Sequence, residues 1–217
     1  MKFSLIASFL SATAIVTAKP VSLNSTATAD LTPTAAADKP NTTGVPQSSQ
    51  TLYPSLQVRF KSKDPKTLAK NTKTGHLLSN PNEQVHTAVY FNLPEAQAAG
   101  KTCRFVFRLS QDDWAIGPGN SPAQFDIYRS DGCLNEGYSW EHRLSPAIHA
   151  GTVTPKKGQE AVWTSIDMRA YPTEAYMGSS PDFPCKSDEY SFEMVAAPGS
   201  NIGWTSGRGS GLSLVIV

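Results

Sequence analysis

Apolar and polar residues alternate in several short segments of this chain, with the period of two that is typical of a half-buried β-strand. The clearest segment is 103–109, where every second residue is apolar and arginine occupies two of the positions between. Comparable segments predict further strands at 56–60, 85–93, 125–128, 147–154, 161–166, 190–194 and 212–217.

Glycine, proline, asparagine and aspartate separate these segments, as in 117–120 and 197–201, and such residues favour turns. One short helical turn is predicted at 95–99, followed by Gly100. About eight strands joined by turns predict an all-β fold, a single antiparallel sandwich of two sheets. We assign this β-sandwich domain to 52–217, which is long enough for one hydrophobic core.

The segment 19–51 has a different composition, with eleven Ser or Thr residues and no aromatic residue. Such a segment cannot bury enough apolar surface to offset the entropy lost on ordering, so we predict a disordered Ser/Thr-rich spacer. Asn24 and Asn41 each begin an Asn-x-Ser/Thr sequon and are the predicted N-glycosylation sites. A pro-segment is the alternative interpretation of this stretch.

The first residues have the pattern of a secretory signal peptide. Lys2 precedes an apolar run over 5–16, and small residues follow up to Ala18. The run is shorter than the roughly 20 apolar residues that span a bilayer, which argues against membrane insertion. We therefore predict cleavage after Ala18 and a protein that is secreted, extracellular or associated with the cell wall.

Charge gives no argument for a nucleic-acid partner. Cleavage of 1–18 removes one of the 19 basic residues, which leaves basic and acidic residues in equal number. Nucleic-acid and anionic-membrane binding normally rest on an excess of positive charge. Neither class of partner is expected here.

Three cysteines remain after the predicted cleavage: Cys103, Cys133 and Cys185. In an oxidising compartment this number is typical of one disulfide and one unpaired thiol. A zinc site is not expected, because structural zinc sites use closely spaced ligand pairs and these cysteines are far apart in the sequence. No metal and no other cofactor are predicted.

No catalytic residue is predicted, because the chain contains neither a Gly-x-Ser-x-Gly nucleophile motif nor a His-Glu-x-x-His metal motif. Asp112 and Asp113 are adjacent, and neighbouring residues on a strand point to opposite faces. A distant pair such as Asp126 and Glu193 stays open for glycoside hydrolysis, which uses two carboxylates. A carbohydrate-active enzyme on a β-sandwich is therefore the alternative function.

Three aromatic residues, Trp114, Tyr138 and Trp140, fall in predicted loops or at strand ends. Exposed aromatic rings can stack on sugar rings and bury apolar area. These three form the candidate ligand platform. The same side chains could instead pack against the ends of the sandwich core, and the sequence leaves both interpretations open.

Several sequence segments occur in a familiar order. They are Tyr-Pro-Ser-Leu at 53–56, Val-Tyr-Phe-Asn-Leu-Pro at 89–94, Gly-Lys-Thr-Cys-Arg-Phe-Val-Phe at 100–107, a late Cys185, Ser-Phe-Glu-Met at 191–194 and an apolar C-terminal strand. This order resembles the fungal But-type C-terminal domain, a family described as binding a ubiquitin-like activating enzyme. The resemblance covers most of 53–217.

The resemblance implies a secreted fungal β-sandwich with a Cys103–Cys185 disulfide. Together with the lack of a catalytic motif, it favours a non-catalytic surface or interaction protein, and the three aromatic residues make a cell-wall or carbohydrate-binding module the most specific form of this prediction. The expected partner is then a cell-wall polysaccharide or an extracellular protein. Two segments depart from the family pattern, an insertion at 131–143 that contains Cys133 and a lysine-rich loop over 61–73.

Overall fold

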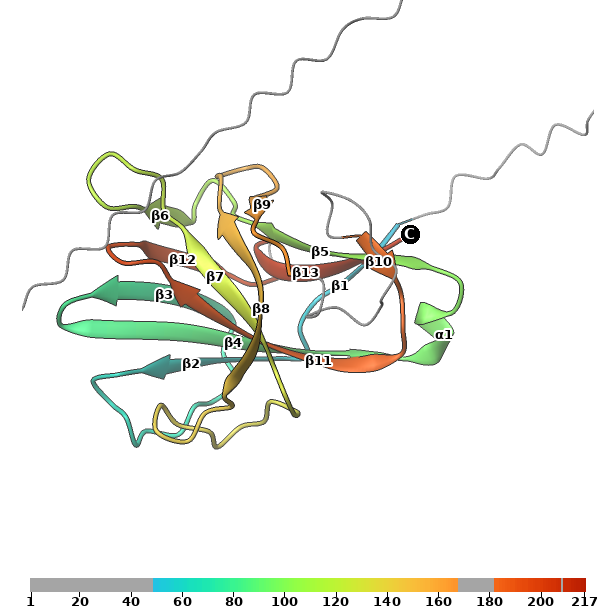
Figure 1. Cartoon of the computed structure of the whole chain (residues 1–217), viewed down its shortest axis with the longest axis horizontal. Coiled ribbons are helices and arrows are strands. Elements are labelled where there is room, and N and C mark those ends of the chain that lie inside the picture. Colours follow the sequence, from blue (N-terminus) through green and yellow to red (C-terminus); the bar gives the residue numbers. More distant parts are fainter. Residues whose placement is uncertain (1–48, 168–181, 208) are drawn as a thin grey trace, which may run out of the picture. The chain divides into compact units, whose positions relative to one another are not determined.

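The computed structural model describes residues 49–167, 182–207 and 209–217. These residues form thirteen β-strands and one short helix (Figure 1). The strands belong to two sheets, and every pairing between them is antiparallel. The predicted all-β sandwich is confirmed.

The smaller sheet has four strands in the order β1-β13-β5-β10. Their bounds are Gln50–Leu52 for β1, Gly211–Ile216 for β13, Thr102–Arg108 for β5 and Asp182–Pro184 for β10. The first strand begins two residues before the predicted start of the domain at 52. It pairs with the last strand, so the two ends of the described domain lie side by side in this sheet.

The larger sheet has nine strands in the order β6-β12-β3-β4-β11-β7-β8-β9, and β2 also pairs with β4. Its bounds are β2 Leu56–Lys61, β3 Thr74–Asn80, β4 Glu83–Leu93, β6 Trp114–Ile116, β7 Phe125–Ser130, β8 Pro146–Thr154, β9 Val162–Thr164, β11 Asp188–Ala196 and β12 Asn201–Thr205. The helix α1, Glu95–Ala98, occupies the predicted helical turn.

A first hydrophobic cluster fills the space between the two sheets. It is rich in aromatic side chains, and Phe105 of the smaller sheet lies at its centre, with its ring centroid 4.8 Å from that of Phe192. Phe107 contacts Phe125 at 4.8 Å and Trp204 at 5.2 Å in the same edge-to-face manner. These rings come from predicted strands, with Trp204 as the exception, so alternation identified most of this core.

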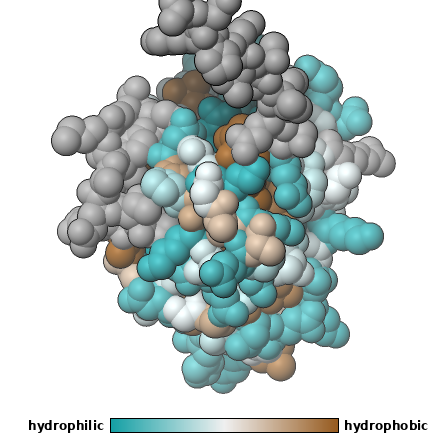
Figure 2. Space-filling model, turned by 90° about the vertical axis from the view of Figure 1, so that its right-hand side faces the viewer, coloured by the Kyte–Doolittle hydropathy of each residue, from teal (hydrophilic) through white to brown (hydrophobic). Residues whose placement is uncertain are grey.

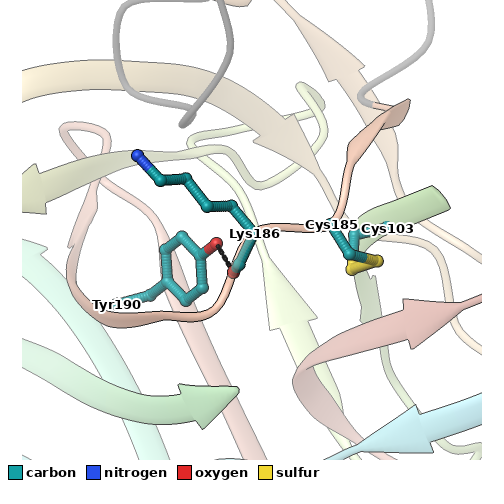
Figure 3. Close-up of a disulfide and its surroundings, with 4 residues drawn as sticks. All are labelled: Cys103, Cys185, Lys186 and Tyr190. Carbon is teal, nitrogen blue, oxygen red and sulfur yellow. Dashed lines mark hydrogen bonds between the residues drawn. A yellow bond between two sulfur atoms is a disulfide. The ribbon is translucent and has the colours of Figure 1, made fainter. Parts of the chain in front are cut away.

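The Cys103–Cys185 disulfide closes one end of the sandwich, as the family resemblance implied. Cys103 lies in β5, and Cys185 directly follows β10, the strand that pairs with β5. Figure 3 shows Lys186, the residue after Cys185, whose carbonyl accepts a hydrogen bond from the Tyr190 hydroxyl at 2.9 Å. The bridge links residues 82 positions apart in the chain.

A second, smaller cluster lies on the other face of β2 and β4. Val58 and Phe60 of β2 and Ala88 of β4 are buried there together with Leu134. Neighbouring residues of β4, such as Val89 and Phe91, belong to the first cluster, as expected from the alternation of side chains across a strand. The second cluster is covered by two loops, 62–73 and 131–145.

The described surface carries no broad apolar patch in the view of Figure 2, where hydrophobic residues occur in small groups among hydrophilic ones. Among the described residues, no helix reaches the length and hydropathy of a membrane-spanning segment. The predicted signal peptide at 1–18, the sequons at Asn24 and Asn41 and nearly all of the predicted spacer at 19–51 lie outside the described residues.

Candidate functional site

Trp114 lies on β6, the edge strand of the larger sheet, and pairs directly with Gly203 of β12. A Cβ atom at Gly203 would overlap three carbons of the indole ring, so the ring rests against the glycine where any side chain would be. The Trp114 side chain is nevertheless 44% exposed. The missing side chain at Gly203 thus creates a supported, solvent-facing aromatic surface.

Trp204 also packs against a glycine, but on the core side of the sheet. It pairs with Gly75 of β3, and its ring overlaps the position that a Gly75 Cβ would occupy. Trp204 is only 2% exposed. Two tryptophans therefore cover two glycines on opposite faces of one part of the sheet. One of them serves the core, and the other faces solvent.

Two polar side chains fix the edge of the Trp114 ring. The indole Nε1–H donates to Asn201 Oδ1 at 3.1 Å, and His76 Nε2 lies 3.0 Å from the same oxygen. Because an amide oxygen only accepts, His76 Nε2 carries the hydrogen of this bond. The amide Nδ2–H groups of Asn201 and the Nδ1 atom of His76 have no partner among the described residues.

The Trp114 surface, defined here as Trp114, Ile116, His76 and Asn201, thus combines apolar area with hydrogen-bonding groups. Ile116 is 58% exposed and shares a face of β6 with Trp114. His76 also contacts the indole directly, with ring centroids 6.0 Å apart in an edge-on arrangement. An aromatic face beside amide and imidazole groups is chemically suited to a sugar ring and its hydroxyls.

The other two predicted platform residues lie elsewhere. Tyr138 and Trp140 are partly buried and pack against the second cluster over β2 and β4. Trp114 packs instead on β12 and β3, as described above. Of the three aromatic residues, the structure brings Tyr138 and Trp140 together and keeps Trp114 on a different part of the sheet.

Trp140 belongs to a charged network that fastens its loop to the sheet. Glu193 Oε1 accepts from His86 Nδ1 at 2.6 Å and from Arg143 Nε at 3.1 Å. Arg143 also donates to the Trp140 carbonyl at 2.6 Å, and its guanidinium lies 4.3 Å from the centroid of the Trp140 ring. The His86 ring also contacts the Trp140 ring directly, with the two ring centroids 4.6 Å apart.

The two covering loops also bond to each other. Ala69 N donates to the Tyr138 carbonyl at 2.7 Å, and Gly137 N donates back to the Ala69 carbonyl at 3.2 Å. Asn71 N is further bound by the Glu136 carboxylate. The two segments that depart from the family pattern in sequence are therefore one structural unit over the outer face of β2 and β4.

The carboxylates left open for catalysis do share one face of the larger sheet. Glu193 pairs with Tyr128, and Asp126 lies two residues from Tyr128 on the same strand. Burial, Asp126 and Glu193 together raise the pKa of the Tyr128 hydroxyl. Glu193 is however 2% exposed and bound to two basic side chains, which removes it from contact with a substrate.

Asp126 is likewise engaged, with Oδ1 bound by His149 Nε2 at 3.1 Å and by the Thr152 hydroxyl at 2.6 Å. Asp113 accepts from the Ser110 backbone N–H at 2.7 Å and from the Ser210 hydroxyl. These carboxylates therefore connect strands and turns of the sandwich. Their hydrogen bonds explain their conformations without a substrate.

Burial acts to raise the pKa of Asp113, but hydrogen bonds from Ser210, Ser110 and Thr205 outweigh it and hold the pKa below its usual value. A carboxyl held in its ionised form by fixed donors is a poor general acid. The role of Asp113 is to join the turn before β6 to the ends of β12 and β13.

Cys133 is the unpaired thiol, and it is exposed. Its Sγ atom donates to Glu189, and this hydrogen bond, with burial and the nearby carboxylates, raises the pKa of the thiol. Tyr90 also bonds to Glu189, and burial together with this bond raises the pKa of Tyr90 to about 12. A thiol in this acidic surrounding is a weak nucleophile at neutral pH.

Three hollows of the described surface differ in chemistry. One of about 310 Å³ is cationic, with Arg59, Lys61 and Lys70 in its wall, and one of about 300 Å³ lies beside Cys133. The largest of the three, about 540 Å³, is lined mainly by neutral polar residues around Tyr53. No group of His, Cys, Asp and Glu suited to a metal ion occurs among the described residues.

Sequence reasoning missed His76, Asn201 and Gly203 as parts of the site. The first lies in a strand that the alternation did not predict, and the other two lie in or after a segment that predicted a turn. The available signal was the Gly-Trp pair at 203–204, since glycine within a strand often marks a close approach of another group.

Comparison with known proteins supports the family resemblance. Residues 52–207 match the family described as the Ubiquitin 3 binding protein But2 C-terminal domain. No curated protein matches the chain with significant similarity. The matched region contains all nine strands of the larger sheet together with β5 and β10 of the smaller one, and it is more than half of the chain. The chain therefore belongs to the But2 C-terminal domain family, whose description is that of a binding protein.

Proposed function

We propose that this chain is a secreted fungal binding protein whose domain holds a neutral cell-wall polysaccharide on the Trp114 surface. Secretion is supported by the apolar run over 5–16 and by the disulfide, since disulfides persist mainly in oxidising compartments. Family membership supports a binding function. The ligand class comes from the geometry of Trp114.

The observation that carries the proposal is the Trp114 ring resting on Gly203 while it is 44% exposed. An aromatic ring that is already held in place loses little entropy when a ligand stacks on it. Asn201 and His76 hold the ring edge and have free donor and acceptor groups beside it. Aromatic contacts of this kind contribute about 0.5–1.5 kcal/mol beyond buried area, so the expected affinity is micromolar to millimolar.

The direct test is a sedimentation assay with insoluble β-glucan and insoluble chitin. The secreted protein is expected to leave solution with at least one of them, whereas Trp114→Ala is expected to remain in solution. The thermal midpoint of Trp114→Ala should stay close to that of the wild type. Binding of neither polysaccharide by the wild type would contradict the proposal.

Val162→Ala is the matched control. Val162 lies on β9, a three-residue edge strand at the opposite end of the same sheet, and is 45% exposed. Its substitution removes exposed apolar area without touching the Trp114 surface, so binding should be unchanged. Equal losses in both variants would point to nonspecific apolar adsorption.

Trp140→Ala tests the other predicted platform residue. Because Trp140 packs against the second cluster and Arg143, this substitution should cost about 2–3 kcal/mol of stability, less than the 3–5 kcal/mol of a fully buried aromatic site. Binding at a temperature where the variant is folded should persist. Loss of binding with unchanged stability would place the ligand on the Trp140 loop instead.

N-terminal sequencing tests the secreted state separately. Protein collected from the culture medium should begin at or near Lys19. A retained Met1 form inside cells would contradict secretion and would leave the chemistry of the Trp114 surface to be tested on other ligands.

A further inference from the structure

The Trp114 surface continues along β12 toward the hollow beside Tyr53. Gly203, which supports the indole, and Thr205 are two residues apart and share one face of the strand, about 7 Å apart. Thr205 is exposed and lines the hollow. Gly203 and Thr205 therefore join the two features on one face of β12.

Strand β3 provides a parallel connection. His76 of the Trp114 surface pairs with Gly203, and Thr74, two residues earlier, pairs with Thr205. The Thr74 hydroxyl lies 3.1 Å from that of Thr72, which lines the hollow. Exposed threonine hydroxyls thus lie between the tryptophan and the hollow on both strands.

The hollow has the size and the wall of a small-ligand site. Its volume of about 540 Å³ falls within the range of ligand pockets. Tyr53, which is 47% exposed, and Pro54 supply apolar area. The remaining wall is mainly polar, with hydroxyl groups from Ser55, Thr72, Thr205 and Ser206 and amide groups from Gln57 and Asn71.

Part of this polar wall is held in place by buried contacts. Gln57 is 4% exposed, donates to the Thr72 carbonyl at 3.3 Å and accepts from the Ser206 hydroxyl at 3.1 Å. Ser206 N also donates to the Lys73 carbonyl at 2.7 Å. The hydroxyl and carbonyl groups that face the hollow are therefore positioned before any ligand binds.

The chemistry of the wall favours a neutral ligand. Lys73 is the one charged residue that lines this hollow in the described part of the chain, and the other polar groups are hydroxyls and amides. These groups both donate and accept hydrogen bonds, as sugar hydroxyls do. The cationic hollow at Arg59, Lys61 and Lys70 offers no comparable match to a neutral chain.

From this continuity we infer that the site takes an extended neutral oligosaccharide, which stacks on Trp114, crosses Thr74 and Thr205, and ends in the Tyr53 hollow. The inference rests on the proposed function and adds a second subsite to it. It requires that affinity grow with the length of the sugar chain, because a short ligand can occupy only one of the two ends.

Isothermal titration calorimetry of the secreted protein with a β-1,3-linked disaccharide and hexasaccharide, and with the matching chitin oligomers, tests this. For the series that binds, the hexasaccharide should bind at least about tenfold more tightly than the disaccharide. Tyr53→Ala should weaken hexasaccharide binding by about threefold to tenfold, as expected for one stacking contact. Disaccharide binding on Trp114 should remain unchanged in that variant.

Leu68→Ala is the control, because Leu68 is 59% exposed and lines the cationic hollow instead. Amide NMR shifts provide a second measurement. The hexasaccharide should move the signals of Thr74, Thr205 and Ser206, whereas the disaccharide should move only those around Trp114.

The failures of the two proposals are distinguishable. If the wild type binds neither sugar length, the proposed function fails. If it binds both lengths equally well, or if Tyr53→Ala binds the hexasaccharide as the wild type does, the Trp114 site stands and the extension to Tyr53 is overturned. Binding of an extracellular protein with no sugar binding would assign this surface to a protein partner and overturn both.

Discussion

The two hydrophobic clusters bury aromatic side chains on opposite faces of β4, but they differ in the kinds of contact that hold them together. The first cluster lies between regular strands, is lined by aliphatic and aromatic side chains and is closed by a disulfide. The second is covered by two loops and includes the His86–Glu193–Arg143 network. Its polar contacts hold loops that have no strand pairing of their own.

This difference separates stability from surface function. The first cluster accounts for the sandwich itself, and where it lies behind the Trp114 surface, at Ile202 and Trp204, its side chains are on the opposite face of the sheet. The second cluster removes Tyr138 and Trp140 from the solvent-facing surface, although their sequence pattern suggested a platform. Of the three predicted platform residues, Trp114 is the one that neither cluster encloses and that can meet a ligand.

Removal of the disulfide, which acts on the first cluster, should cause the largest loss of stability. The bridge closes a loop of 82 residues, and the chain-entropy model assigns such a loop about 4–5 kcal/mol. The Cys103→Ser, Cys185→Ser double variant should lose about this much in urea unfolding. Cys133→Ser should change stability by less than about 0.5 kcal/mol, because its thiol is exposed.

A loss below about 1 kcal/mol for the double variant would show that the first cluster does not depend on the bridge. The strand pairing between β5 and β10 would then be sufficient to close this end of the sandwich.

Glu193→Gln, which acts on the second cluster, should cause the second-largest loss of stability. The substitution leaves His86 and Arg143 without the buried carboxylate that they share, and breaking such a group costs about 3 kcal/mol. Hydrogen exchange should increase at Leu134, whose N–H donates to the Ser191 hydroxyl at 2.9 Å. Amide hydrogen exchange in β5 should increase only by the amount that the loss of global stability explains.

Glu83→Gln is the control for this prediction. Glu83 pairs with Lys63 at 3.6 Å near the surface, and an exposed pair of this kind is worth less than about 1 kcal/mol. Equal losses of stability in Glu193→Gln and Glu83→Gln would contradict a special role of the charged network in fastening the loop.

Asp113→Asn should have a smaller effect that depends on pH. The folded pKa of Asp113 lies below its ordinary value of 3.8, so the carboxylate stabilises the fold at higher pH and loses this contribution as pH falls through the folded pKa. The variant should be about 1–2 kcal/mol less stable at pH 7, and the difference should shrink below about pH 4. Thermal unfolding at several pH values measures it, and a difference that grows on acidification would refute the assignment.

The smallest expected effect concerns the chemical reactivity of the Cys133 thiol. Because Glu189 raises the pKa of this thiol, alkylation by iodoacetamide should be slow at pH 7 and should accelerate at higher pH. Glu189→Gln should lower the thiol pKa and increase the rate at pH 8. An unchanged rate would mean that the thiol and Glu189 do not bond in solution.

Alternation predicted strands such as β5 and β11, in which apolar and polar residues alternate over most of the predicted segment. Segments 103–109 and 190–194 correspond to β5 and β11, and both supply the centre of the first cluster. It did not predict β12, where Gly203 interrupts the pattern, or β6 and β10, which contain three residues each. Such strands depend on pairing with neighbours that are distant in sequence, and the local pattern contains no information about those neighbours.

For the site, the sequence by itself determined that Trp114, Tyr138 and Trp140 are aromatic residues outside the strongest strand patterns. The tertiary structure decided which of them faces solvent, because that depends on Gly203 beneath one ring and on the 62–73 loop against the others. Periodicity of two records which face of a strand a residue occupies. Whether that face is then covered is a matter of long-range packing, and only the folded chain decides it.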